Sequence, residues 1–116
     1  MIVIQRPFKP ECAQVAVANL LGLPLSRVRQ VFDELGYKAF GRIEVTPPEA
    51  TARVLSVLTR KPWKIVRHLS DAGRSYGIAS NGQHAVAFCD DIVQDGARFY
   101  SLWEFRPCRF YVPEDL

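Results

Sequence analysis

The hydrophobic pattern of this chain changes once, near residues 60–62, and this change constrains its fold more than any other feature. Before this point apolar residues recur at the spacing of amphipathic helices, and after it they occur in short strand-like runs separated by turn residues. Because helices and strands are segregated along the chain, the pattern predicts an α+β architecture. We expect N-terminal helices packed on a C-terminal antiparallel β-sheet.

The expected elements follow from this pattern and from their end signals. Gly22 is placed to end a mostly apolar first helix, and Thr46-Pro47-Pro48-Glu49 is typical of a helix start. Residues 1–7 are expected to be extended. The predicted helices cover residues 12–21, 23–35 and 46–59, and the predicted strands cover residues 63–67, 76–80, 84–88, 92–95, 99–103 and 108–112. A chain of 116 residues is the length of one domain, so we expect residues 1–116 to form a single domain.

Composition and charge narrow the class of protein. Fifteen Lys and Arg against twelve Asp and Glu give a net charge of +3, which is too mild to indicate nucleic-acid binding. Basic residues surround Trp63, and the alternatives there are a nucleic-acid surface with a stacking aromatic or a solvated sheet edge protected from aggregation; we favour the sheet edge. No apolar run could span a membrane, and no signal peptide is visible at the N-terminus.

The three cysteines are Cys12, Cys89 and Cys108. An odd number with no close pair predicts free thiols in a reducing cytoplasm. Cys-x-x-Cys or similar ligand spacing is absent from the sequence, so we expect neither a metal nor another cofactor.

Cys12 is the most informative of these thiols because it falls at the start of the predicted first helix. The unpaired N–H groups and the positive dipole end of a helix favour a thiolate over a thiol. Taken alone, a cysteine here is more often a small buried hydrophobic residue.

His84 and Asp95 form a second group of candidate residues. If Asp90 and Asp91 make a two-residue hairpin turn, side-chain alternation places Asp95 on the same sheet face as His84 and Val86. Asp95 is then a diagonal neighbour of His84, within reach of a carboxylate–imidazole hydrogen bond. Taken separately, His84 could be only a polar strand end and Asp95 only part of a turn.

Together these residues predict a relay for nucleophilic catalysis. Cys12 is the expected nucleophile, His84 its base and later its acid, and Asp95 the group that orients the imidazole. The reaction also needs donors for the developing oxyanion, and the backbone N–H of Cys12 and the Gln5 amide are the candidates.

The order Gln5, Cys12, His84 and Asp95 resembles that of papain-like cysteine peptidases. Residues 11–24, from Glu11-Cys12 to Leu23-Pro24, are similar to the opening of the bacteriocin-leader-processing (C39-like) peptidases and their small phage and bacterial relatives. The segment 82–88 is similar to their Gly-x-His-aliphatic strand. The resemblance implies a papain-like fold, a Cys-His-Asp triad and a peptide or protein substrate.

Two departures from the family pattern keep a second function open. Ala13 stands where the family has glycine, and the Asp95-Gly96 context lacks the family's proline. The first hypothesis is therefore a thiol amide hydrolase. The alternative is a catalytically inactive relative, of phage origin for example, that binds a host or partner protein.

Overall fold

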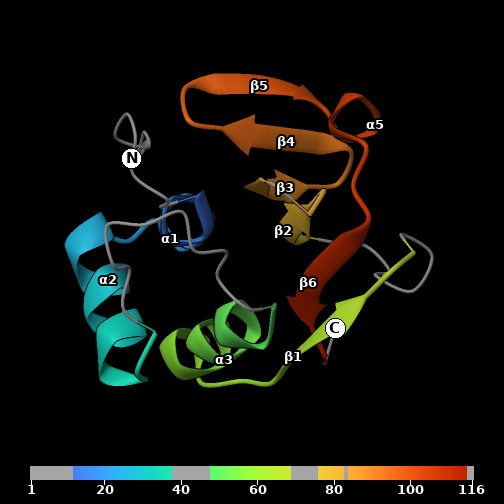
Figure 1. Cartoon of the computed structure of the whole chain (residues 1–116). Helices are drawn as coiled ribbons and strands as arrows, with labels where there is room; N and C mark the ends of the chain where they lie inside the picture. The colour runs from blue at the N-terminus through green and yellow to red at the C-terminus, as the bar shows by residue number, and fades with distance from the viewer. Residues whose placement is uncertain (1–11, 38–47, 69–75, 83, 115–116) are drawn as a thin grey trace.

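The computed structural model describes residues 12–37, 48–68, 76–82 and 84–114 (Figure 1). Three helices come first: α1 (Cys12–Leu21), α2 (Leu25–Glu34) and α3 (Pro48–Thr59). They are followed by β1 (Trp63–Val66), β2 (Tyr76–Ser80), β3 (Ala85–Cys89), β4 (Ile92–Asp95), β5 (Arg98–Ser101), the short helix α5 (Leu102–Phe105) and β6 (Arg109–Pro113). The predicted α+β class, with helices before strands, is confirmed.

The strands form one six-stranded antiparallel sheet in the order β1-β6-β2-β3-β4-β5. Strands β2 to β5 are successive hairpins, whereas β6 returns to lie between β1 and β2. Strand β1 is therefore an edge strand, and its Lys64 is half-buried while Arg67 just beyond it is exposed. Lys64 and Arg67 therefore lie at an edge of the sheet.

Apolar side chains cover both faces of the sheet. On one face, α1, α2 and α3 pack with Trp63, Ile78 and Tyr111. Helix α1 lies between α2 and strand β3 (Figure 1). On the other face, Phe88 and Phe110 meet edge to face with ring centroids 5.6 Å apart, and α5 adds Leu102 and Phe105 to this second cluster. Helix α1 is thus fixed by contacts with α2 on one side and with the sheet on the other, which holds its first turn against the start of β3.

One glycine is required where β2 and β6 approach. A Cβ at Gly77 would meet the carbonyl oxygen of Tyr111, so no larger residue fits without moving the strands. Gly22 has a different role, because its φ of +67° ends α1 in the left-handed conformation expected of a residue that follows a helix.

The prediction of a strand over residues 99–103 was wrong at its end. Strand β5 stops at Ser101, and Leu102–Phe105 form α5. The Ser101 hydroxyl caps this helix by accepting the backbone N–H of Trp103 at 3.2 Å. Leu102 and Phe105, three residues apart, are both buried in the same cluster, because a helical turn places residues at this spacing on one face.

Several expectations fall outside the described residues, namely the extended segment 1–7, the position of Gln5 and the first two residues of the helix-start signal, Thr46 and Pro47. Within the described part of the chain, no helix has both the length and the apolar character needed to cross a membrane.

Candidate active site

Cys12 is the first residue of α1, and its side chain is only half-buried. Its thiol therefore lies at the positive end of a helix that is anchored in the core by the buried residues after it. Burial raises the pKa of the Cys12 thiol, but hydrogen bonds with His84 and from the backbone at Ala85 outweigh this effect. The pKa of Cys12 is lowered from its ordinary value of 9.0.

His84 is held at the turn that leads into β3. Its backbone N–H donates to Oδ1 of Asn81 at 2.9 Å, and its carbonyl accepts the Asn81 backbone N–H at 3.2 Å. The imidazole lies against Phe105 of α5, with ring centroids 6.2 Å apart. The backbone and one side of the ring are thus both fixed, while 36% of the side chain remains exposed.

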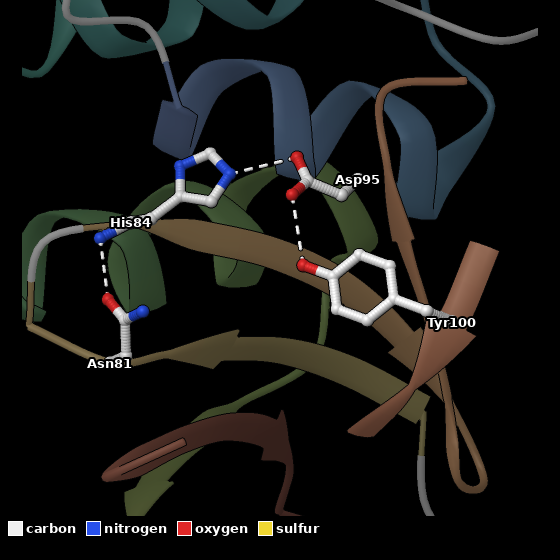
Figure 2. Close-up of polar contacts among 4 residues, drawn as sticks. All are labelled: Asn81, His84, Asp95 and Tyr100. Carbon is white, nitrogen blue, oxygen red and sulfur yellow. Dashed lines mark hydrogen bonds and ion pairs between the residues drawn. The ribbon is translucent and has the colours of Figure 1, made fainter. Parts of the chain in front are cut away.

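Asp95 ends β4 next to His84. Cys89 pairs with Ile92 and Phe88 with Val93, so Asp90 and Asp91 form the predicted two-residue turn. His84 Nε2 lies 2.9 Å from Oδ1 of Asp95. Since a carboxylate only accepts, Nε2 carries the hydrogen in this bond. The remaining ring nitrogen, Nδ1, lies on the side of the first turn of α1 (Figure 2).

The electrostatics couple the thiol and the imidazole. The hydrogen bond with Cys12 is the largest cause that raises the pKa of His84; burial opposes it, and the Asp95 carboxylate reinforces it, giving a value of about 9. Because the pKa of Cys12 is lowered at the same time, a thiolate and an imidazolium coexist at pH values between the two. This pairing is the charge state that a cysteine nucleophile needs.

The three side chains open into one cleft of about 210 Å³. One wall is a single face of α1, on which Cys12, Val15, Ala16 and Asn19 follow at helical spacing. The other wall comes from the start of β3, the end of β4 and the turn that follows. Most lining side chains are small, so a substrate can approach the thiol closely.

A second cavity of about 180 Å³ continues this cleft along α1. The two cavities share Asn19 and Gln94. The rim of the second cavity carries Ile92 and Phe99, large apolar side chains that are 46% and 60% exposed. The two adjacent cavities are together called the groove, with the thiol in the first and these large apolar side chains at the second.

Other candidate residues lie outside this group. Cys89 and Cys108 are free and exposed, and only Cys89 contacts the groove, at its apolar end. Gln5 lies outside the described residues, so its proposed place in the oxyanion site has no structural account. Among the described residues, no three His, Cys, Asp or Glu side chains are grouped as metal ligands.

Sequence reasoning missed Tyr100 and Phe105. The Tyr100 hydroxyl donates to Oδ2 of Asp95 at 3.0 Å, and Phe105 contacts the His84 ring. Tyr100 could have been found from a second two-residue turn, Gly96-Ala97, which places Tyr100 opposite Val93 and on the face of Asp95. Phe105 could not be found in this way, because it belongs to α5 and the sequence predicts a strand where this helix begins.

Comparisons of this chain with models of known protein families, with curated proteins and with solved structures gave no significant match.

Proposed function

We propose that this protein is a cysteine peptidase, or a related thiol amide hydrolase, with a papain-like fold. The observation that carries the proposal is that Cys12, His84 and Asp95 line a single cleft, in which the imidazole is hydrogen-bonded to Asp95 and its interaction with Cys12 raises its pKa. A buried thiol alone would have a raised pKa, so a lowered pKa of Cys12 beside a raised pKa of His84 supports a functional role for the pair.

The reaction begins when the Cys12 thiolate attacks the carbonyl carbon of an amide and forms a C–S bond. The oxyanion is stabilised by backbone N–H groups at the start of α1, with Cys12 N–H the first candidate. The C–N bond then breaks as His84 Nδ1 gives its proton to the leaving amine. This leaves a thioester on Cys12 and a neutral imidazole.

Hydrolysis of the thioester restores the site. A water molecule gives a proton to His84 Nδ1 while its oxygen attacks the thioester carbonyl, and the C–S bond breaks to release a carboxylic acid and the Cys12 thiolate. Asp95 accepts the Nε2 hydrogen of His84 throughout, which keeps Nδ1 directed at the reacting atoms.

The groove supports a peptide as the substrate. The α1 face from Cys12 to Leu20 spans about 12 Å at the helical rise of about 1.5 Å per residue. That is the length of three to four residues of extended peptide at roughly 3.3 Å each. A peptide with its scissile bond at Cys12 could therefore place an apolar side chain against Ile92 and Phe99.

Ala13 does not weigh against catalysis. Its side chain is buried in the helix-side core, and it is absent from the described lining of the cleft. The Ala13 methyl group, at the position where C39-like peptidases have glycine, therefore packs into the core and away from the cleft.

A peptide library incubated with the protein tests the proposal. Wild-type protein should release new peptide termini, and acid quenching should trap an acyl adduct on Cys12 that intact mass spectrometry detects. Cys12→Ser and His84→Ala should abolish both signals, and Cys108→Ser, which changes an exposed thiol away from the cleft, should leave them unchanged. Cleavage that persists in Cys12→Ser, or a wild-type protein with neither products nor adduct, would refute the proposal.

The second candidate function is binding without cleavage. It is favoured by the exposure of Trp103 and Phe99, 66% and 60%, because large exposed aromatics are typical of partner-binding surfaces. A purified stoichiometric complex that forms equally with wild type and with Cys12→Ser, and in which the partner stays intact, would support this function over the first.

A further inference from the structure

The Asp95 carboxylate is held by two side chains. Oδ1 lies 2.9 Å from His84 Nε2, and Oδ2 accepts the Tyr100 hydroxyl at 3.0 Å (Figure 2). A carboxylate with one bonded oxygen can still rotate about its Cβ–Cγ bond, whereas one bonded through both oxygens has a fixed plane. The hydrogen bond from the Tyr100 hydroxyl therefore stabilises the orientation of the carboxylate in which Oδ1 faces the imidazole.

The backbone places Tyr100 for this contact. Asp95 pairs with Arg98 and Val93 with Tyr100 across the β4–β5 hairpin, so these four side chains share a face. Tyr100 is thus the diagonal neighbour of Asp95, just as Asp95 is of His84. The turn before β3, the end of β4 and strand β5 thus supply the imidazole, the carboxylate and the phenol.

Arg98 fixes Tyr100 rather than neutralising Asp95. Its guanidinium lies 5.0 Å from the centre of the Tyr100 ring, in the geometry of a cation–π contact. Although Arg98 is directly opposite Asp95, no ion pair between the two is found among the described residues. The carboxylate charge therefore stays available to the imidazole.

The phenol also keeps its proton. Burial, followed by the hydrogen bond to the Asp95 carboxylate, raises the pKa of Tyr100 above its ordinary value of 10.0. Tyr100 remains a donor over the whole range in which the thiolate and imidazolium coexist.

From this geometry we infer that Tyr100 is a positioning residue, a fourth member of the Cys12–His84–Asp95 chain that locks the carboxylate through Oδ2. The inference rests on the proposed function where it concerns rate, but the effect on the imidazole can be measured without any substrate. Tyr100 touches none of the reacting atoms and acts only through Asp95.

Tyr100→Phe tests the inference because it keeps the ring and its contact with Arg98 and removes only the hydroxyl. Water can hydrate the exposed side of Oδ2, so this oxygen keeps a hydrogen-bond partner but the carboxylate loses its fixed plane. We expect the Nε2 proton of His84, followed by NMR, to exchange with solvent about 3- to 10-fold faster, as the loss of one hydrogen bond would give. Hydrolysis should show a kcat lower by a similar factor with KM unchanged.

Tyr76→Phe is the matched control, since it also removes a phenol hydroxyl, one that accepts from Lys61 Nζ at 2.9 Å. It should change neither the exchange rate nor kcat. In an Asp95→Ala background, Tyr100→Phe should have no further effect on the reactivity of Cys12. An unchanged Nε2 exchange rate in Tyr100→Phe would overturn the inference. So would a loss of Cys12 reactivity on Tyr100→Phe that is equally large with Asp95 and with Asp95→Ala. If the exchange result holds and no hydrolysis is found, the proposed function fails and the positioning role stands.

Discussion

The reactivity of Cys12 towards iodoacetamide at low pH is the most direct consequence of the site. A thiol with the ordinary pKa of 9.0 is only about 0.1% ionised at pH 6. Each tenfold rise in thiol acidity gives tenfold more thiolate at that pH, while the nucleophilicity of the thiolate falls about threefold. The net gain is roughly threefold for each such step, so the lowered pKa of Cys12 should make its alkylation at pH 6 faster than that of Cys89 or Cys108.

The dependence of the Cys12 alkylation rate on pH shows the direction of the pKa shift. The Cys12 rate should be nearly flat from its lowered pKa up to about 9, where His84 loses its proton, because the thiolate fraction is already complete. Hydrolysis, if present, should fall as the pH rises through about 9, because the protonated His84 that supplies the leaving amine is lost there.

His84→Ala removes the largest interaction that lowers the pKa of Cys12 and leaves the backbone of α1 and β3 around the thiol in place. Alkylation of Cys12 at pH 6 should then fall, and its profile should move to higher pH. His68→Ala, at an exposed position after β1, is the matched control and should change nothing. Peptide mass mapping of all three thiols over time gives each rate in one sample. Equal rates for the three thiols at pH 6, or no response to His84→Ala, would refute the ion-pair reasoning.

Two further substitutions test the groove and the sheet. Phe99→Ser should raise KM for a peptide with an apolar residue by roughly tenfold with kcat unchanged, because the apolar contact is lost equally in the bound ground state and in the transition state. A Phe99→Leu variant should retain binding. An unchanged KM for Phe99→Ser would contradict the assignment of the groove as the substrate site. Gly77→Ala should lower the melting temperature, followed by circular dichroism, more than Gly22→Ala does. Gly77→Ala forces β2 away from β6, whereas Gly22→Ala has open space around it and costs only about 1–2 kcal/mol of strain in the left-handed conformation. A larger drop in melting temperature for Gly22→Ala than for Gly77→Ala would contradict this packing.

The order of elements and the relation of His84 to Asp95 could be predicted from the sequence because both depend on local rules. Helical spacing, strand alternation and a two-residue turn fixed which side chains share a face. The sequence could not show that Ser101 caps a new helix, because burial of Leu102 and Phe105 decides that point. It also could not show the contact of Cys12 with His84, which depends on how α1 packs against β3.

The packing of α1 against the sheet also determines when the thiol becomes reactive. His84, Asp95 and Tyr100 belong to adjacent hairpins, so they can come together as soon as those hairpins form. Cys12 reaches them only when the first helix docks from the opposite half of the chain. A nascent or partly unfolded molecule therefore carries a thiol without its imidazole partner. Cys12 becomes reactive only when the tertiary structure is complete.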